Sequence, residues 1–435
     1  MTDAPLGPAF EQSAPRVALV NLGCRVNRVE IDLIASRLEQ AGCEICDQED
    51  ADLVVINTCA VTGEAQSKTR KAVRHAAQLE QRPIVVATGC VANLFADELR
   101  AAAPGVVVER DKRAVADRAL SELGWSERAP FEHGHLAVAP TPTGRTRPGI
   151  KIQDGCDNRC SFCIVWKARG PSRSLASRDI VAAVEEACRR GAHEVVLTGI
   201  NLGSYRAGAD DELAEGARLD ALLAHLLEVT GIERIRLSSI EPPDVTNELL
   251  DVMAASDGRV APFLHVCLQS GCDATLSRMR RVYDTADFRD LVQRARARMP
   301  KIALGTDLIV GFPGETDGEF AQSYAFCEEM AFARMHVFRY SKRPGTPAAV
   351  APDQVAAQVS ARRGGQMRAL ARQMRAQQAA LLDGDLDLVL VQGAGTAVNA
   401  QLFDVEVLPT LPLGALVPVR LQYVGGDRLK GLSAE

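Results

Sequence analysis

The sequence predicts an α/β fold in three parts: an N-terminal open parallel sheet domain, a central partial barrel of βα units and a small C-terminal all-β domain. Short apolar runs alternate with helical segments over residues 16–125, and again from 149 to about 339. Such alternation is typical of parallel sheets. Residues 354–382 then form one long helical pattern rich in Ala, Gln and Arg. Beyond it, short strand-like runs are split by Gly and Pro, which predicts a separate all-β module with strands at 386–391, 398–403, 405–407, 416–421 and 425–430.

The first stretch is expected to form a parallel sheet, in which ligands gather at the carboxyl ends of the strands. Cys24, Cys59 and Cys90 stand at those ends, each before a helical segment whose N-terminal dipole favours a thiolate. One such cysteine would be a core residue by default, but three in equivalent places predict a three-thiolate site. The expected strands are 17–22, 53–57, 84–88 and 106–108, and the expected helices are 27–41 and 65–79.

The central stretch is expected to form a partial or full parallel barrel with its site at the carboxyl ends of the strands. The first strand, 150–153, leads into Gly-Cys-Asp-Asn-Arg-Cys-Ser-Phe-Cys, which gives Cys156, Cys160 and Cys163 a C-x3-C-x2-C spacing. Three such thiolates can hold three irons of a 4Fe–4S cube and leave the fourth iron open to a small molecule. A structural zinc site would need four ligands, usually in C-x2-C pairs, and no second pair follows at a fitting distance. The other expected strands are 194–197, 234–238, 264–268, 303–310 and 333–338, and a linker is expected over 126–144.

Composition limits the class of protein. A chain of 435 residues suggests two to four domains. The chain contains no run of eighteen apolar residues, so no transmembrane helix is expected. Twelve cysteines without a visible secretory signal indicate a reducing compartment and metal or redox chemistry rather than disulfides. The net charge is −6, but residues 143–178 carry eight Lys or Arg against two Asp. Such a run would either face a phosphate backbone or form a solvated surface with its counter-charges elsewhere.

The chain from Arg16 onward resembles the radical S-adenosylmethionine (SAM) methylthiotransferase family. It is most similar to the tRNA threonylcarbamoyladenosine (MtaB) type, because it reads Gly-Cys-Arg-Val-Asn at 23–27 and Asn-Thr-Cys-Ala-Val-Thr-Gly-Glu-Ala at 57–65. The isopentenyladenosine type usually reads Gly-Cys-Gln-Met-Asn at the first place, and the ribosomal-protein type Gly-Cys-Pro-Lys-Asn. Barrel motifs match in the expected order: Leu-Thr-Gly-Ile-Asn-Leu-Gly-Ser-Tyr at 197–205, Ser-Ser-Ile-Glu-Pro at 238–242, Leu-Gln-Ser-Gly at 268–271, Gly-Phe-Pro-Gly-Glu-Thr at 311–316 and Arg-Pro-Gly-Thr-Pro-Ala at 343–348.

The resemblance implies an enzyme that methylthiolates carbon 2 of N6-threonylcarbamoyladenosine in tRNA, 3′ to the anticodon, after a 5′-deoxyadenosyl radical has removed the hydrogen. It implies two 4Fe–4S clusters: a SAM-cleaving cluster on Cys156, Cys160 and Cys163, and a sulfur-supplying auxiliary cluster on Cys24, Cys59 and Cys90. The expected partners are tRNA and an electron donor such as a flavodoxin or ferredoxin, for a monomer in the cytoplasm. The expected domains are 16–128 with the auxiliary cluster, 143–370 as the radical SAM core and 372–435 as a TRAM-like β-barrel.

Further residues are candidates for contacts to SAM and RNA. The chain departs from the family pattern at 165–170 and at Cys267, and from Ala376 onward it carries seven Asp or Glu against three Lys or Arg, which disfavours phosphate binding. The candidates for tRNA phosphate or the SAM carboxylate are Arg169, Arg173 and Arg343, with an ordinary surface arginine as the alternative for each. The candidates for SAM are Phe162, Gly199, Asn201, Gln269 and Ser270, with packing and turn formation as the alternative.

Rival functions stay open at the level of the sequence. The nearest is the same chemistry on isopentenyladenosine or on a ribosomal-protein aspartate, and the motifs at 23–27 and 57–65 argue against both. A non-catalytic iron–sulfur protein that carries electrons or binds RNA is a rival of another class. A zinc-stabilised scaffold is the third.

Overall fold

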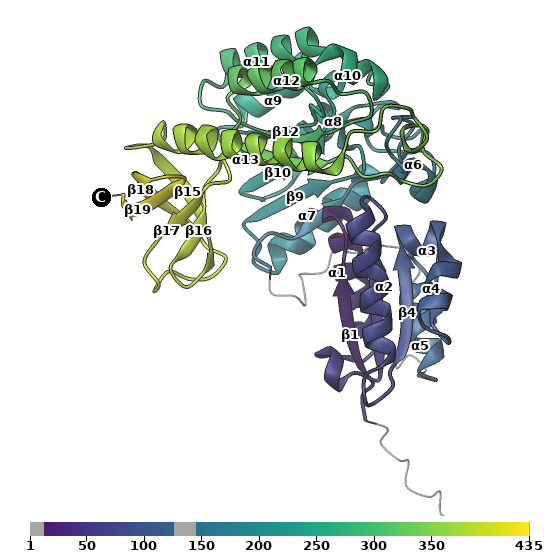
Figure 1. The fold of residues 1–435 in the computed structure, drawn as a ribbon. Coiled ribbons are helices and arrows are strands. Elements are labelled where there is room, and N and C mark those ends of the chain that lie inside the picture. The colour runs from purple at the N-terminus through teal and green to yellow at the C-terminus, as the bar shows by residue number, and fades with distance from the viewer. Residues whose placement is uncertain (1–12, 126–144, 435) are drawn as a thin grey trace, which may run out of the picture.

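The structure is a computed structural model, and it describes residues 13–125 and 145–434. Figure 1 shows three bodies: an N-terminal sheet covered by helices, a central array of strands wrapped by helices, and a small β-barrel beside that array. The three-part α/β fold predicted from the sequence is confirmed. The expected linker at 126–144 lies outside the described residues. In the described part of the chain, no helix is both long enough and apolar enough to span a bilayer.

The N-terminal sheet is parallel, with the strand order β2-β1-β3-β4-β5. Its central strand is buried along its whole length, because helices cover both faces. Apolar residues of α1 and α5 pack on one face, and those of α2 and α4 pack on the other. The strands are β1 (Arg16–Asn21), β2 (Glu44–Ile45), β3 (Leu53–Thr58), β4 (Ile84–Gly89) and β5 (Val107–Val108), and the helices are α1 (Arg25–Gln40), α2 (Gly63–Ala77), α3 (Cys90–Leu94), α4 (Ala96–Ala102) and α5 (Val115–Glu122).

The central body is a partial barrel of parallel strands. One sheet has the order β10-β9-β6 and the next has the order β11-β12-β13-β14. A single residue, Ser238, separates β10 from β11, so the row of strands continues from one sheet into the other. Its strands are β6 (Gly149–Lys151), β9 (Glu194–Thr198), β10 (Arg234–Leu237), β11 (Ser239–Ile240), β12 (Phe263–Val266), β13 (Ala303–Val310) and β14 (Arg334–Arg339), and β7 (Gln153–Asp154) pairs with β8 (Arg173–Ser174) beside them.

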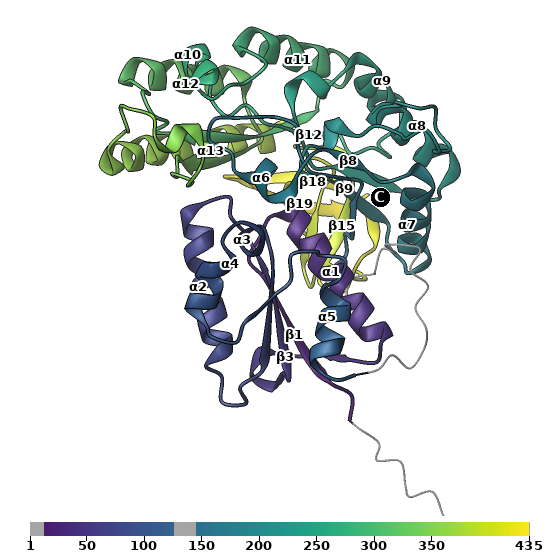
Figure 2. The ribbon, with the colours of Figure 1, turned by 90° about the vertical axis from the view of Figure 1, so that its right-hand side faces the viewer.

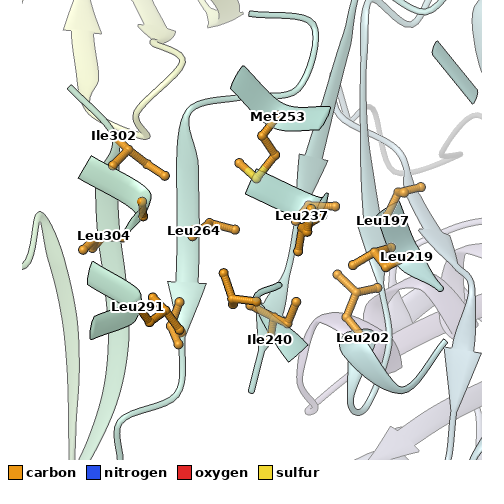
Figure 3. Close-up of a cluster of buried hydrophobic side chains, with 14 of the residues drawn as sticks. Leu197, Leu202, Leu219, Leu237, Ile240, Met253, Leu264, Leu291, Ile302 and Leu304 are labelled. Carbon is orange, nitrogen blue, oxygen red and sulfur yellow. The ribbon is translucent and has the colours of Figure 1, made fainter. Parts of the chain in front are cut away.

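Helices cover the outside of the partial barrel. Leucine and isoleucine side chains from the strands meet those of the helices in one continuous apolar core, part of which is drawn in Figure 3. Helix α12 begins with a capping box between Thr316 and Glu319, which fixes the turn out of β13. The helices are α6 (Val165–Arg169), α7 (Ser177–Arg189), α8 (Leu219–Val229), α9 (Asn247–Ala255), α10 (Asp273–Arg278), α11 (Thr285–Arg298), α12 (Asp317–Met330) and the long α13 (Ala357–Ala380).

The C-terminal body is a closed five-stranded barrel with the order β15-β16-β17-β19-β18. The predicted strand over 398–403 is wrong, because the chain turns after Val398. Asn399 closes this turn: its N–H donates to the Phe403 carbonyl oxygen at 3.0 Å, and its Oδ1 accepts from the Phe403 N–H at 2.7 Å. The strands are β15 (Leu386–Gly393), β16 (Thr396–Val398), β17 (Asp404–Glu406), β18 (Leu416–Gly425) and β19 (Arg428–Ser433).

The three bodies contact one another directly. Helix α1 lies against β6 so closely that a Cβ atom at Gly149 would stand 2.4 Å from Val29 Cγ2. Buried Arg236 on β10 donates to Glu194 Oε1 at 2.7 Å and to the carbonyl oxygen of Ala400 at 2.7 Å, which fixes the C-terminal barrel on the central one. Figure 2 shows the N-terminal sheet below the central strands, with α3 and α6 facing each other at the junction.

Candidate active site

The three N-terminal cysteines meet at one edge of the first sheet. Cys24 directly precedes α1, Cys59 follows β3, and Cys90 is the first residue of α3. Cys59 and Cys90 are buried, whereas Cys24 is exposed. Burial is the main cause that raises the pKa of Cys59 to about 11, and the nearby sulfurs of Cys90 and Cys24 add to it. The three thiols therefore lie near one another at this edge, and their role as cluster ligands stays a prediction.

Buried amides hold this edge in place. Asn27 Nδ2 donates to Asn57 Oδ1 and to the carbonyl oxygen of Thr58, both at 2.9 Å. Asn27 Oδ1 accepts from Cys24 Sγ at 3.2 Å, so the first turn of α1 is tied to its own cysteine. Gly89 has φ 97°, and a Cβ atom there would lie 2.4 Å from the Thr58 carbonyl oxygen. Only glycine lets the ends of β3 and β4 come so close beside Cys90.

The second set of cysteines lies on the loop that links β7 to α6. Cys156 donates its N–H to the Gly170 carbonyl oxygen at 3.1 Å, and Cys163 donates its N–H to the Cys160 carbonyl oxygen at 3.2 Å. Burial raises the pKa of Cys163 to about 12, and the sulfurs of Cys160 and Cys156 contribute. The loop therefore folds its three thiols toward one another.

Both sets of thiols fit iron–sulfur clusters. Ionising a buried thiol is costly without a cation, and iron supplies the positive charge that keeps such sulfurs as thiolates. Three thiols at each place match three irons of a 4Fe–4S cube, with the fourth iron free for another ligand.

A short contact joins the two cysteine regions. Helix α3, which starts at Cys90, packs against α6, which starts two residues after Cys163. Asn93 Nδ2 on α3 donates to the carbonyl oxygen of Ala168 on α6 at 2.8 Å. The segments that carry the two predicted three-thiol sites therefore meet at the junction of the N-terminal sheet and the partial barrel.

Arg281 is a site residue that the sequence analysis missed. Its Nη1 donates to Cys160 Sγ at 2.9 Å, and its guanidinium also pairs with Glu241. Burial would lower the pKa of Arg281, but Tyr283 and Cys160 outweigh burial and raise it. A fixed positive charge thus lies against one predicted cluster ligand. In the sequence, Arg281 is marked only by its position shortly after the α10 segment. Its contact with the cysteine loop, 121 residues earlier, could therefore not be predicted from the sequence.

The SAM candidates lie around the cluster loop and at strand ends. Phe162 packs edge-on against Phe312, with ring centroids 6.4 Å apart. The Asn201 N–H donates to Gln153 Oε1 at 2.9 Å, whereas its buried side-chain Oδ1 has no hydrogen-bond partner among the described residues. Gly199 lies against the same glutamine, since a Cβ atom there would be 2.9 Å from Gln153 Oε1. Asn201 thus keeps one polar atom available for a ligand.

The last two SAM candidates hold the turn after β12. Gln269 has φ 65° and donates its N–H to the Asp307 carbonyl oxygen at 2.9 Å. The buried Ser270 hydroxyl accepts from the Cys272 N–H at 3.3 Å. These contacts suit the alternative of turn formation. The role of Gln269 and Ser270 toward SAM stays a prediction.

The three arginine candidates differ in exposure. Arg343 is 2% exposed and bonds to Gln66 on α2, and Arg169 is 7% exposed and lies inside an ion-pair network. Only Arg173 is on the surface, with a side chain that is 56% exposed. Arg169 and Arg343 are thus buried at the contact with the N-terminal domain, so the alternative of an ordinary surface arginine is wrong for both. Their roles toward tRNA phosphate or the SAM carboxylate stay predictions.

The network around Arg169 joins two domains. Its guanidinium donates to Glu30 Oε1 at 2.8 Å, to Glu30 Oε2 at 3.2 Å and to Asp154 Oδ1 at 3.0 Å. Lys112 and Lys151 also pair with Glu30. Burial favours a neutral Glu30, but these cations outweigh it and hold the pKa of Glu30 well below its usual range. Part of the basic run at 143–178 is therefore neutralised from α1.

A cavity of about 1070 Å³ opens beside this network. Its walls come from α1, α5 and the β7–β8 region, and Arg169 and Arg173 both line it. None of the six predicted cluster cysteines lines it. The cavity is therefore a cleft between the domains, next to the paired three-thiol sites rather than at them.

Three adjacent barrel strands bring titratable groups together. His265 Nε2 on β12 lies 3.1 Å from Asp307 Oδ1 on β13, and His336 Nδ1 on β14 lies 3.2 Å from the same oxygen. Cys267 Sγ lies 3.9 Å from Asp307 Oδ2. Burial favours a neutral Asp307, but hydrogen bonds from the two histidines outweigh it and hold its pKa well below the usual range. The sequence did not reveal this group, because its members lie on separate strands.

Comparison with known proteins agrees with this geometry. Residues 150–327 match the family described as "Radical SAM superfamily", and residues 16–109 match "Uncharacterized protein family UPF0004". The "Threonylcarbamoyladenosine tRNA methylthiotransferase MtaB" of Bacillus subtilis is 37% identical over 385 residues, which cover 85% of this chain and 83% of that protein. The chain belongs to the radical SAM methylthiotransferase family.

Other relatives in this family differ in their names. The Thermotoga maritima protein, also named MtaB, is 36% identical over 76% of each chain. The "Ribosomal protein uS12 methylthiotransferase RimO" of Syntrophotalea carbinolica is 32% identical, with 87% of this chain and 85% of that protein covered. Among solved structures, the radical SAM methyltransferase TsrM from Kitasatospora setae has a TM-score of 0.53 and 18% identity, covering 78% of this chain and 77% of that one, a likeness of fold.

Proposed function

We propose that this methylthiotransferase acts on tRNA and adds a methylthio group to carbon 2 of N6-threonylcarbamoyladenosine, 3′ to the anticodon. The observation that supports the proposal is the contact between α3 and α6, which brings the segments of the two predicted three-thiol sites together. A single three-thiol loop would serve many radical SAM reactions. A second one close to it provides a sulfur donor beside the radical site, which methylthio transfer needs.

The protein positions the chemistry that its cofactors carry. When bound, a cluster on Cys156, Cys160 and Cys163 with SAM supplies a 5′-deoxyadenosyl radical, and a cluster on Cys24, Cys59 and Cys90 supplies sulfur. The polypeptide fixes the geometry around them. Phe162 packs its ring against Phe312 beside the cysteine loop, Asn201 offers an amide oxygen without a partner among the described residues, and Arg281 donates a hydrogen bond to the sulfur of Cys160.

The substrate assignment rests on relatives and on two motifs. Proteins named MtaB are 34–37% identical to this chain. Relatives named for uS12 or for dimethylallyladenosine follow at 31–33%, and they define the second candidate substrate class. The residues at 23–27 and 57–65 favour the first class. A cytoplasmic monomer that receives electrons from a flavodoxin or ferredoxin completes the proposal.

The deciding experiment is nucleoside mass spectrometry. The anaerobically reconstituted protein is incubated with SAM, a reductant and tRNA carrying N6-threonylcarbamoyladenosine. The 2-methylthio derivative is the expected product. If 5′-deoxyadenosine forms without it, the radical site is right and the substrate is wrong, and tRNA with isopentenyladenosine and the ribosomal protein are then tested. If neither SAM cleavage nor product occurs in protein with full iron and sulfide content, a non-catalytic iron–sulfur protein is the better interpretation.

A further inference from the structure

Three side chains with metal-binding atoms meet on the inner face of the partial barrel. Leu264 on β12 and Leu304 on β13 belong to the apolar core between the strands and the helices, and Figure 3 labels both. Because side chains alternate along a strand, His265, Cys267 and Asp307 point to the opposite face. One imidazole nitrogen, one sulfur and one carboxylate oxygen of this group all lie within 4.8 Å of one another.

The Asp307 carboxylate lies between the other two donors. Its Oδ1 is 3.1 Å from His265 Nε2, and its Oδ2 is 3.9 Å from Cys267 Sγ. In a tetrahedral zinc site, bonds of about 2.0–2.3 Å place neighbouring ligand atoms about 3.3–3.6 Å apart. The three donors are therefore close to the separations that a zinc ion requires, and small movements of the side chains would bring them onto one ion.

The imidazole of His265 is buried without adequate hydrogen bonds. The residue is 1% exposed, and neither ring nitrogen has a well-aligned hydrogen-bond partner among the described residues. Gly305 makes room for the ring, since a Cβ atom there would lie 2.8 Å from His265 Nδ1. An unpaired nitrogen in a buried place is unfavourable, whereas a bond from Nε2 to a metal ion would satisfy it.

His336 orients the carboxylate of this group. Arg334 Nε donates to His336 Nε2 at 3.2 Å, so that nitrogen accepts and the ring hydrogen is on Nδ1. Nδ1 lies 3.2 Å from Asp307 Oδ1 and therefore donates to it. Carboxylates that bind metals are commonly held in this way by an outer partner. With both nitrogens of His336 engaged, three protein ligands remain for a metal ion.

We propose that His265, Cys267 and Asp307 bind one Zn²⁺ ion, with a water molecule in the fourth position. Imidazole, thiolate and carboxylate are all ligands of zinc, and three protein ligands leave one position open. A thiolate and a carboxylate together balance the charge of the ion, so the filled site is neutral. The Asp307 and His336 side chains are 25% and 38% exposed, so water can reach this face.

This site is separate from the two predicted clusters but connected to one of them. None of the six predicted cluster cysteines takes part, and Cys267 is a position at which the chain departs from the family pattern. The Tyr283 hydroxyl donates to the Cys267 carbonyl oxygen at 2.6 Å and accepts from Arg281 Nε at 3.0 Å. Arg281 in turn donates to Cys160 Sγ at 2.9 Å. Zinc on Cys267 would therefore steady the segment that holds Arg281 against the cysteine loop.

The experiment measures zinc binding by the holoenzyme. Anaerobically reconstituted protein with full iron and sulfide content is treated with a chelator to remove loosely bound metal, and is then titrated with Zn²⁺ against a fluorescent zinc indicator. Wild type is expected to bind one zinc ion per chain without losing iron. Zinc X-ray absorption should show one sulfur at about 2.3 Å and nitrogen or oxygen ligands at about 2.0–2.2 Å.

Variants test the ligands one at a time. His336→Asn should lose about 10- to 100-fold in zinc affinity, as is usual for an outer partner. Cys267→Ala, His265→Gln and Asp307→Asn should each lose more than that. Cys272→Ala is the matched control and should bind as wild type, because Cys272 is also buried but its Sγ lies against Gln322 Oε1 at 3.2 Å. Zinc should raise the midpoint of thermal unfolding for wild type and Cys272→Ala, but not for Cys267→Ala.

Two results would overturn the proposal. If wild type with full iron content binds no zinc, or if the three ligand variants bind it as tightly as wild type, any zinc on the protein is an adventitious ion only. If the zinc spectrum shows two or three sulfurs and iron is lost, zinc has displaced iron at the cluster cysteines. Where one ligand variant fails to hold its iron, the other two decide. Neither tRNA nor methylthio transfer enters these measurements, so they are independent of the proposed function.

Discussion

Replacing Arg169 with glutamine should loosen the attachment of the N-terminal domain to the partial barrel. Arg169 lies on α6 and binds Glu30 on α1 through two hydrogen bonds of 2.8 and 3.2 Å, and both side chains are 3% exposed. The variant would leave the Glu30 carboxylate buried without its main partner. Glutamine is too short to reach both carboxylate oxygens.

The structure sets the size of this effect. Removing one partner of a buried ion pair usually costs about 3–5 kcal/mol, because the other charge is left uncompensated. Lys112 and Lys151 still pair with Glu30 and offset part of that cost. We therefore expect a loss of about 2–3 kcal/mol in the free energy of unfolding. At about 2–3 kcal/mol per M of urea, the midpoint should fall by about 1 M.

Intrinsic fluorescence can follow this change, because Trp125 belongs to the N-terminal domain and Trp166 lies on α6. Arg173→Gln is the matched control, since Arg173 is four residues away and its side chain is 56% exposed. A double variant with Glu30→Gln should lose less than the sum of the two single changes. Equal midpoint shifts for Arg169→Gln and Arg173→Gln, or strict additivity in the double variant, would refute the reasoning.

Three further outcomes are expected. The depressed pKa of Glu30 means that its stabilising contribution is present above the unfolded value of about 4.3 and is lost as the pH falls below that value. The free energy of unfolding of Glu30→Gln, measured with urea, should therefore differ most from that of wild type at neutral pH and approach it in acid. A difference that stays constant with pH would contradict this. Cys160→Ala should abolish both 5′-deoxyadenosine and methylthio product, whereas Cys59→Ala should keep the former and lose the latter; product from Cys59→Ala would remove the auxiliary site. Arg281→Met should make the reduction potential of the SAM-cleaving cluster more negative by about 60 mV, because a charge-assisted hydrogen bond to Cys160 is lost. An EPR-monitored redox titration measures this shift. An unchanged potential would show that this bond does not stabilise the reduced cluster.

Much of this architecture follows from local patterns. Alternating apolar and helical segments gave the parallel strands, and parallel strands place their carboxyl ends at one edge, which is why Cys24, Cys59 and Cys90 could be grouped from sequence. The turn at Asn399 was missed because the apolar residues around it suit a strand equally well. A side-chain hydrogen bond to Phe403, not hydrophobicity, decides the backbone there.

Contacts between domains could not be predicted in the same way. Arg169 finds Glu30 139 residues away, and Arg343 finds Gln66 277 residues away. No periodicity within either segment encodes those partners. Arginine in a basic run therefore suggested RNA, whereas the acidic residues that neutralise part of that run lie on another domain. The same limit hid Arg281, which donates to Cys160 Sγ on a loop 121 residues earlier.

The network around Arg169 also bears on how the two three-thiol sites work together. Arg169 Nη2 donates to Asn27 Oδ1 at 2.9 Å, and that oxygen also accepts from Cys24 Sγ at 3.2 Å. Arg169 itself ends α6, which begins two residues after Cys163. One arginine and one asparagine thus connect Cys24, a predicted ligand of the first site, to the helix that directly follows the second set of cysteines. Because every bond in this network is buried or partly buried and directional, it holds Cys24 in a fixed place relative to α6. The ion pair that docks the domains therefore also aligns the two predicted cluster sites.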